Sequence, residues 1–349
     1  MKSKTKRFLH TFFKIFIVFM LITALVNIIL FAAIAINHKN KLKKEKNHLN
    51  APGTMIETDG HKLHVMTGGD ENGEATLVFL HSVCVVDDSI ALQPLMSELK
   101  NCKYAYVDRS GYGFSEASNT ERSIENQLEE TRKALKNAGV EGPYVLVAIG
   151  TSGVEAFYWA KTYPDEVDSI IGIDMIYPEQ FANTTADEYC GFFDYLYVKF
   201  CAIGGHRLVK SVFPTNKYGV YDERQMNTRN ALIGRGNYTE DIYNEQLKMI
   251  DNAAKVTAMG IPDTDMYLLY SNPMLEPYLS TDEAILKSYN DAMVKDSETD
   301  YVSAYNQVFR NYFENCQNVI IEEISGYSRI YTYSPKTIAE KINDFIIKK

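Results

Sequence analysis

The chain has 349 residues, 46% of them hydrophobic, which is enough to bury the core of one large α/β domain with a short appendage. Its formal net charge is −9, and the first 50 residues contain ten basic residues and one acidic residue, so the remainder carries −18. This acidic balance argues against nucleic acid or an anionic surface as a partner of the main body, and we expect no nucleic-acid binding.

The chain contains five cysteines, an odd number, and none of them has the spacing of metal ligands. We therefore expect mostly buried free thiols, and we expect neither a metal site nor a cofactor. Cys190 and Cys201 form the one local pair that could close a disulfide.

The first segment of the chain has the composition of a membrane anchor. Residues 15–36 are apolar except for Thr23 and Asn27, and a helix of this length crosses a bilayer. Residues 1–14 form a basic flank, and residues 37–53 form a polar, lysine-rich linker to a folded domain at 54–349. We expect an uncleaved single-pass anchor in the cell membrane.

A cleaved signal peptide is the alternative for this segment. Residues 33–35 read Ala-Ile-Ala and imitate a cleavage site, although the apolar core of a signal peptide is usually shorter, about 7–15 residues. Basic residues flank both ends of the apolar segment almost equally. The charge pattern therefore leaves the orientation open, and the extracytoplasmic side is slightly favoured for the body.

The remainder of the chain alternates strand and helix patterns, which predicts a mostly parallel sheet covered by helices on both faces. Asp59 and Gly60 are a hairpin signal between the first two strands. We expect the strands at 104–108, 145–149 and 169–174 to be adjacent and parallel. Strands are predicted at 55–57, 62–67, 75–81, 103–108, 145–149, 167–174, 265–271 and 318–323, and helices at 89–99, 123–137, 281–295 and 337–347.

Two turns carry the most specific motifs. Residues 108–115 read Asp-Arg-Ser-Gly-Tyr-Gly-Phe-Ser directly after a predicted strand, and the glycines permit a tight turn. The apolar run 143–149 stops at the small residues 150–153, and a helical pattern follows. Strand, small-residue turn and helix form the layout of a nucleophile elbow, which holds a catalytic side chain in a strained, exposed position.

These motifs resemble the α/β-hydrolases over roughly residues 55–347. Residues 108–115 are similar to the D-x-x-G-x-G-x-S turn of that superfamily, and residues 148–152 occupy the place of its G-x-S-x-G elbow. Residues 163–175 and the spacing of the elbow most resemble the proline-iminopeptidase-like branch. The resemblance implies an α/β-hydrolase fold with a central, mostly parallel sheet flanked by helices and an inserted helical cap at about 177–259. The N-terminal transmembrane helix would precede this domain.

The resemblance implies a catalytic nucleophile at the elbow, but the position that corresponds to it is Gly150, which has no side chain. Ser152 is the alternative nucleophile, although we expect it to cap the N–H of Glu155 at the start of the helix. Cys84 is a second alternative, and His81 is the histidine placed to activate it.

The histidine position is also changed. In the superfamily the histidine follows the last strand in a G-x-H pattern, and this chain has Ser328 there, a few residues before Pro335. Serine cannot act as a general base near neutral pH. His206 is the last histidine in the chain, and it lies in the expected cap, where it is a weak candidate for a substitute base.

The acid position after the strand at 265–271 is Asn272, and the nearest carboxylate is that of Glu276. Asp174, at the end of the preceding strand, is the alternative acid. The oxyanion hole would use backbone N–H groups near Thr151 and in the loop at Ser82, where the superfamily has glycine.

Nucleophile, acid and histidine have changed together, which predicts a pseudo-hydrolase. Such a protein would bind a small apolar or peptide ligand in a pocket preserved between the sheet and the cap, or its domain would dock a protein partner. Two alternatives stay open. The chain could be an active serine hydrolase of esterase or aminopeptidase type that uses displaced residues, or a purely structural or interaction module whose pocket is filled by its own side chains.

Overall fold

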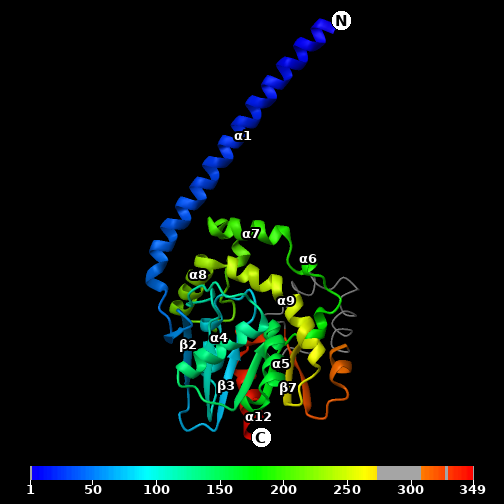
Figure 1. The fold of residues 1–349 in the computed structure, drawn as a ribbon. Helices are drawn as coiled ribbons and strands as arrows, with labels where there is room; N and C mark the ends of the chain where they lie inside the picture. Colours follow the sequence, from blue (N-terminus) through cyan, green and yellow to red (C-terminus); the bar gives the residue numbers. More distant parts are fainter. Residues whose placement is uncertain (1, 273–307, 327–328, 349) are drawn as a thin grey trace.

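A computed structural model describes residues 2–272, 308–326 and 329–348 of the chain. Within these residues the body contains one sheet of eight strands, in the spatial order β1-β2-β4-β3-β5-β6-β7-β8. Helices cover both faces of the sheet, and α1 projects away from it (Figure 1). The strands are β1 (Thr54–Thr58), β2 (His61–Gly69), β3 (Ala75–Leu80), β4 (Cys102–Val107), β5 (Tyr144–Ile149), β6 (Val167–Ile173), β7 (Asp265–Asn272) and β8 (Val319–Ser325).

Each predicted strand is present, with its ends within two residues of the predicted ones. The helices are α1 (Lys2–Glu45), α2 (Asp88–Ala91), α3 (Gln93–Met96), α4 (Ile124–Asn137), α5 (Gly153–Thr162), α6 (Ala186–Tyr189), α7 (Phe192–Ala202), α8 (Glu223–Gly236), α9 (Glu240–Met259) and α12 (Pro335–Lys348). The short 3₁₀ segments used below are η1 (Lys46–His48), η2 (Gly150–Ser152), η5 (Gly205–Leu208), η6 (Lys210–Val212) and η7 (Ile330–Thr332).

Two of the predicted helices need comment. The helix predicted at 89–99 is divided into α2 and α3, because Pro94 at the start of α3 has no N–H to continue the first helix. The helix predicted at 281–295 lies outside the described residues.

The strand order corrects one expectation about the sheet. The strands at 104–108 and 145–149 are not adjacent, because β3 lies between them and pairs in parallel with both, Val78 facing Ala105 on one side and Leu146 on the other. The chain leaves β3 toward β4 and then crosses back through α4 to β5. The order of the sheet therefore reverses at β3, and in open α/β sheets ligands bind at the carboxyl ends of the strands at such a point.

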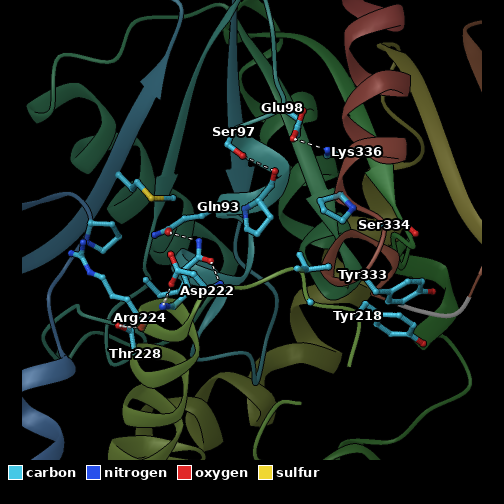
Figure 2. Close-up of a pocket in the computed structure, with 18 of the residues that line it drawn as sticks. Gln93, Ser97, Glu98, Tyr218, Asp222, Arg224, Thr228, Tyr333, Ser334 and Lys336 are labelled. Atoms are coloured by element: carbon cyan, nitrogen blue, oxygen red, sulfur yellow. Dashed lines mark hydrogen bonds and ion pairs between the residues drawn. The ribbon is translucent and has the colours of Figure 1, made fainter. Parts of the chain in front are cut away.

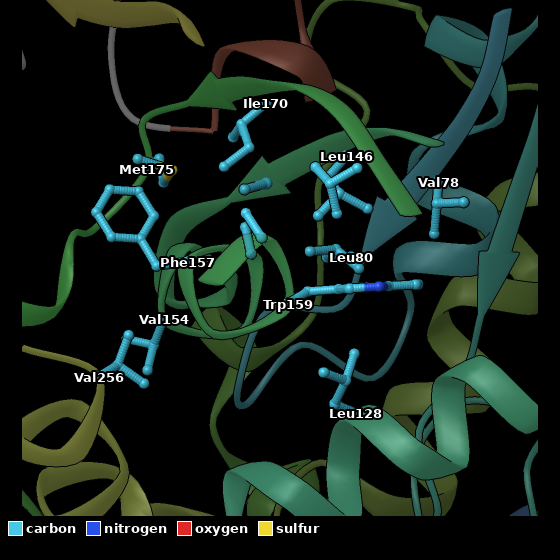
Figure 3. Close-up of a cluster of buried hydrophobic side chains, with 14 of the residues drawn as sticks. Val78, Leu80, Leu128, Leu146, Val154, Phe157, Trp159, Ile170, Met175 and Val256 are labelled. Carbon is cyan, nitrogen blue, oxygen red and sulfur yellow. The ribbon is translucent and has the colours of Figure 1, made fainter. Parts of the chain in front are cut away.

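The core lies on both faces of the sheet, and strand periodicity explains it. In β3, Val78 and Leu80 face α4 and α5, whereas Leu77 and Phe79 face the layer of α3 and α12, because successive strand residues point to opposite faces. Figure 3 shows the first layer, in which Trp159 of α5 lies between strand residues and Leu128 of α4.

Residues 177–259, all of which the structure describes, contain helices and no strand. We call this segment the helical insertion. A hydrophobic cluster joins it to the loops that follow β3 and β4, so the insertion covers the carboxyl ends of these strands. The cluster consists of Val86, Tyr112, Val198, Cys201, Ile233, Tyr238 and Ile242.

Helix α1 continues beyond the apolar segment, and residues 37–45 of the expected linker are part of it. Among the described residues, one helical segment is long and apolar enough to cross a membrane; it runs from His10 to His48, most of it is α1, and the mean hydropathy of its apolar window is 2.9. Its last turns contact the body. Arg207 donates hydrogen bonds from its two terminal nitrogens to Glu45, at 2.8 and 2.6 Å, and from Nε to Nδ1 of His38 at 2.9 Å.

Candidate functional site

The positions that the sequence analysis selected gather at the carboxyl ends of β3, β5, β6 and β7. Ser82 follows β3, Gly150 follows β5, Asp174 follows β6 and Asn272 ends β7. Ser328 and Glu276 lie outside the described residues. The site is therefore built from loops that meet at the reversal point of the sheet.

The elbow has the geometry of a nucleophile turn. Strand β5 ends at Ile149, and Gly150 adopts φ +52°, a left-handed conformation that glycine reaches without strain. The 3₁₀ turn η2 follows and leads into α5. The chain has a sharp strand-to-helix turn here, and Gly150, at the position expected for the nucleophile, has no side chain.

The hydroxyl group of Ser82 occupies the space in front of Gly150. A Cβ atom at position 150 would lie 3.0 Å from Oγ of Ser82, which is tighter than an ordinary van der Waals contact. Ser82 Oγ also lies 3.2 Å from Oγ1 of Thr151, and Thr151 Oγ1 accepts a hydrogen bond from the N–H of Val83 at 2.9 Å.

This arrangement affects the oxyanion hole as well as the nucleophile. In the nucleophile-elbow layout, one oxyanion donor is a backbone N–H from the loop after β3. Here the loop N–H of Val83 already donates to the side chain of Thr151. The N–H expected to serve as an oxyanion donor is therefore already bonded to a side chain of the protein.

Ser152 differs from its predicted role. Its Oγ does not cap Glu155 but folds back onto the end of β5, where it accepts from the N–H of Ile149 at 2.8 Å and donates to the carbonyl oxygen of Ile149 at 2.9 Å. The helical turn begins at Gly150, so the serine lies beside the strand end and satisfies its polar groups. Ser152 is only 1% exposed, and its hydroxyl is bonded to the backbone of the strand end.

Cys84 and His81 are both held in their neutral forms. Burial raises the pKa of Cys84 to about 12, so the thiolate that a nucleophile requires is not formed near neutral pH. Burial lowers the pKa of His81 to about 4, and its ring packs 4.4 Å from that of Tyr112. Neither residue has the environment of an activated thiol–imidazole pair.

The carboxylate of Asp174 holds the surrounding backbone in place. One oxygen accepts from the N–H and the hydroxyl of Ser271, at 2.8 and 2.7 Å, and the other accepts from the N–H of Arg329 at 3.1 Å. Burial raises its pKa. Asn272 donates from Nδ2 to Glu323 at 2.7 Å, which links β7 to β8. Both acid candidates therefore make structural contacts.

His206 lies away from the elbow, and Cys190 and Cys201 form no disulfide. His206 is fully buried at the base of α1, with its ring 5.9 Å from that of His38. Cys190 and Cys201 are both free thiols, so the disulfide that their spacing allows is not formed. Within the part of the chain that the structure describes, no group of three or more His, Cys, Asp or Glu residues is placed to hold a metal ion.

Comparisons with known proteins agree with this architecture. No protein-family model matches the chain. Uncharacterized protein YbdG of Bacillus subtilis (strain 168) is 29% identical over 340 residues, which cover 95% of this chain and 97% of that one. The solved epoxide hydrolase CorEH superposes with a TM-score of 0.56 and 15% identity over 84% of this chain and 97% of its own.

A haloalkane dehalogenase from Bradyrhizobium elkanii, the DbeA-M1 loop variant, superposes with a TM-score of 0.53 and 13% identity, covering 84% of this chain and 96% of its own. The chain has the α/β-hydrolase fold. Identities this low establish the fold alone, so the chemistry has to be argued from the residues of the site.

In this α/β-hydrolase fold the D-x-x-G-x-G-x-S turn is tied down by a buried pair. Nδ1 of His64 lies 2.8 Å from Asp108, and Nε2 of His64 accepts from the N–H of Gly53 at 3.1 Å. Burial alone would raise the pKa of Asp108, but the hydrogen bond from His64 and nearby charges lower it. Both ring nitrogens of His64 are used, so this His–Asp pair joins the turn to the segment after α1.

A buried ion network is the feature of this fold that the sequence analysis missed. Arg109 pairs with Glu155 of α5 and Glu245 of α9, and Arg122 pairs with Glu130 of α4 at 3.0 Å. All five side chains are at most 7% exposed. The signal in the sequence is a glutamate within an apolar helical segment, as at Glu155 between Val154 and Ala156. The network fastens the helical insertion to the body.

A surface groove of about 920 Å³ lies beside the end of α1 (Figure 2). The rings of Tyr218 and Tyr333 are 5.4 Å apart at one end, and Arg224 and Thr228 lie across from them. Residues that line the groove come from the segment after α1, from β4, from α3 and the turn after it, from the loop before α8 and the first turns of α8, and from the start of α12 with the residues before it. They include Asn50, Pro52, Gln93, Pro94, Glu98, Tyr104, Tyr218, Arg224, Thr228, Tyr333, Pro335 and Lys336.

Proposed function

We propose that this protein is a membrane-anchored pseudo-hydrolase, a protein that uses the α/β-hydrolase fold to bind a ligand without hydrolysing it. The observation that carries the proposal is the contact at the elbow, where Ser82 Oγ would lie 3.0 Å from a Cβ atom at position 150. A nucleophile cannot be accommodated there unless Ser82 moves.

The other groups of the site support the same conclusion. Hydrolysis by this fold needs a nucleophile, a base that takes its proton and an acid that orients the base. The hydroxyl of Ser152 is bonded to Ile149, and the carboxylate of Asp174 is bonded to Ser271 and Arg329. These contacts weigh against an active hydrolase that uses displaced residues.

The groove supports a binding role. Its volume of about 920 Å³ lies within the range of typical ligand sites, about 300–1,000 Å³. Its tyrosine and proline side chains suit an extended peptide, because aromatic grooves recognise such segments. The space between the helical insertion and the loops after β3 and β4 holds a hydrophobic cluster instead, which favours the groove as the binding site.

The proposal includes the anchor, the cap and the finer family assignment. Helix α1 would span the cell membrane once, and the helical insertion would take the place of the superfamily's cap. The branch assignment, to proteins like the proline iminopeptidases, rests on residues 163–175 and on the spacing of the elbow. The full-length protein should remain in the membrane pellet after carbonate treatment and should be released by detergent.

Labelling with a serine-reactive fluorophosphonate tests the proposed absence of catalysis. The full-length protein in detergent micelles should remain unlabelled under conditions that label an active serine hydrolase in the same sample. A labelled band that disappears in Ser152→Ala would show that the chain is an active hydrolase.

The groove can be tested separately with a proline-rich peptide. A rise in melting temperature with this peptide, absent in Tyr218→Ala, would identify the groove as the ligand site.

A further inference from the structure

The helical insertion carries large exposed apolar side chains on two neighbouring segments. On α7, Phe192 is 69% exposed, Phe193 82% and Leu196 45%. At the end of η5, Leu208 is 63% exposed and Val209 41%. We call these five residues the apolar face. Single exposed apolar residues are ordinary on a protein surface, but a contiguous group marks an interaction site.

Helix α7 is apolar on both of its sides, which is unusual for a surface helix. Phe192 and Leu196 are one turn apart and share a face with Phe193, whereas Val198 and Cys201 on the other side are buried in the cluster beneath. The buried side accounts for the position of α7 on the body. The exposed side therefore needs a second apolar partner.

The attachment of α1 indicates what that partner is. The apolar segment of α1 ends at Ile36, and Ile34 and Ala35 are already half-buried. His38 is only 8% exposed and accepts a hydrogen bond from Arg207, the residue before Leu208. With a rise of about 1.5 Å per residue, His38 lies only about 3 Å beyond the end of the apolar segment along the helix.

The dimensions of a bilayer limit how far the helical insertion can lie from the membrane, because His38 of α1 is held against the insertion. A bilayer of about 40–45 Å has a hydrocarbon core of about 30 Å, which leaves about 5–8 Å of headgroups on each side. If α1 spans the core with residues 15–36, His38 lies among the headgroups. The part of the insertion that holds His38 must then reach the same layer, and Figure 1 shows α7 on the end of the body from which α1 extends.

We propose that the apolar face inserts into the interfacial layer of the bilayer that α1 spans, so that the body lies flat against the membrane. This inference rests on the proposed membrane anchoring of α1. Charge contributes little, because the body is acidic and Lys199 on α7 is paired with Glu240. Apolar insertion beside basic residues of α1, such as Lys39 and Lys41, is the interaction that fits a lipid surface.

Tryptophan quenching by lipid tests this arrangement in the full-length protein. Three variants, Phe193→Trp, Ile347→Trp and Phe19→Trp, would each be reconstituted in phosphatidylcholine vesicles with and without brominated acyl chains. Ile347 is the matched control because it is 68% exposed in the last turn of α12, and the C-terminal end of the chain lies at the opposite end of the body from α7 (Figure 1). The native Trp159 is fully buried and provides a constant background.

The inference predicts quenching of the tryptophan in Phe193→Trp severalfold greater than in Ile347→Trp. Phe19→Trp reports on the anchor, because residue 19 lies within the apolar segment. If Phe19→Trp is quenched and Phe193→Trp is quenched no more than Ile347→Trp, the docking inference is wrong while the anchor stands. If Phe19→Trp is not quenched, the anchor fails and the docking inference fails with it.

A second copy of the chain is the competing partner for the apolar face. In that case the emission of Phe193→Trp would be shifted to the blue without lipid quenching, and the shift would grow with the protein-to-lipid ratio. This outcome would also overturn docking to the membrane.

Discussion

Replacing Gly150 by serine restores a hydroxymethyl group to the elbow, and the structure predicts that this change lowers the free energy of unfolding for two separable reasons. The first is backbone strain, because a residue other than glycine at φ +52° costs about 1–3 kcal/mol. The second is the contact with Ser82, whose hydroxyl must turn away from Thr151 and lose a hydrogen bond worth about 0.5–1.5 kcal/mol.

Gly139→Ser is the matched control for the first reason. Gly139 has φ +74°, and no atom lies within 4 Å of the position of its Cβ, so serine there adds strain without a contact. Gly150→Ser should therefore cost about 0.5–1.5 kcal/mol more than Gly139→Ser. In a chain that also carries Ser82→Ala, this excess should disappear, which makes the interaction measurable as a double-mutant cycle.

Thermal unfolding of the full-length protein in detergent micelles provides the measurement. For a domain of this size, 1 kcal/mol corresponds to a shift of roughly 2 °C in melting temperature. Equal costs for Gly150→Ser and Gly139→Ser, or an excess that persists without the hydroxyl of Ser82, would refute the claim that Ser82 fills the nucleophile position.

Three further predictions concern single residues. Burial raises the pKa of Asp88 to about 7, whereas the same carboxyl group in the unfolded chain has a pKa near 4. The stability that depends on protonated Asp88 is therefore complete below pH 4 and is lost as the pH rises toward 7. Asp88→Asn should flatten the decline in melting temperature between pH 4 and 8. Ser152→Ala should lower the free energy of unfolding by about 0.5–1.5 kcal/mol, measured by the same thermal unfolding, and leave fluorophosphonate labelling at background. Cys84 should resist iodoacetamide at pH 8 until the protein unfolds, as mass spectrometry of the alkylated chain would show, because burial raises its pKa to about 12.

Local features of the fold could be predicted from the sequence because they depend on neighbouring residues. The apolar runs define the strands to within two residues, and Ser123 caps α4 through the N–H of Asn126. The small residues after β5 indicate the elbow at Gly150. Pro94 is also a local signal, because it explains why the helix predicted at 89–99 is divided into α2 and α3.

Features that depend on distant residues could not be predicted. The position of β3 between β4 and β5 depends on the path of the crossovers, and Ser82 meets Thr151 across 69 positions of the chain. The pairing of Arg109 with Glu245 joins residues 136 positions apart. The capping role predicted for Ser152 was wrong for a local reason. The helical turn starts at Gly150 and brings the hydroxyl of Ser152 back to Ile149.

Turnover of ester and aminoacyl reporter substrates by the purified, unmutated, full-length protein tests the central claim most directly. The account predicts a rate equal to that of buffer alone, and the same rate for Ser152→Ala. A clear rate that Ser152→Ala abolishes would contradict it, because the hydroxyl now bonded to Ile149 would then be the nucleophile of an active hydrolase.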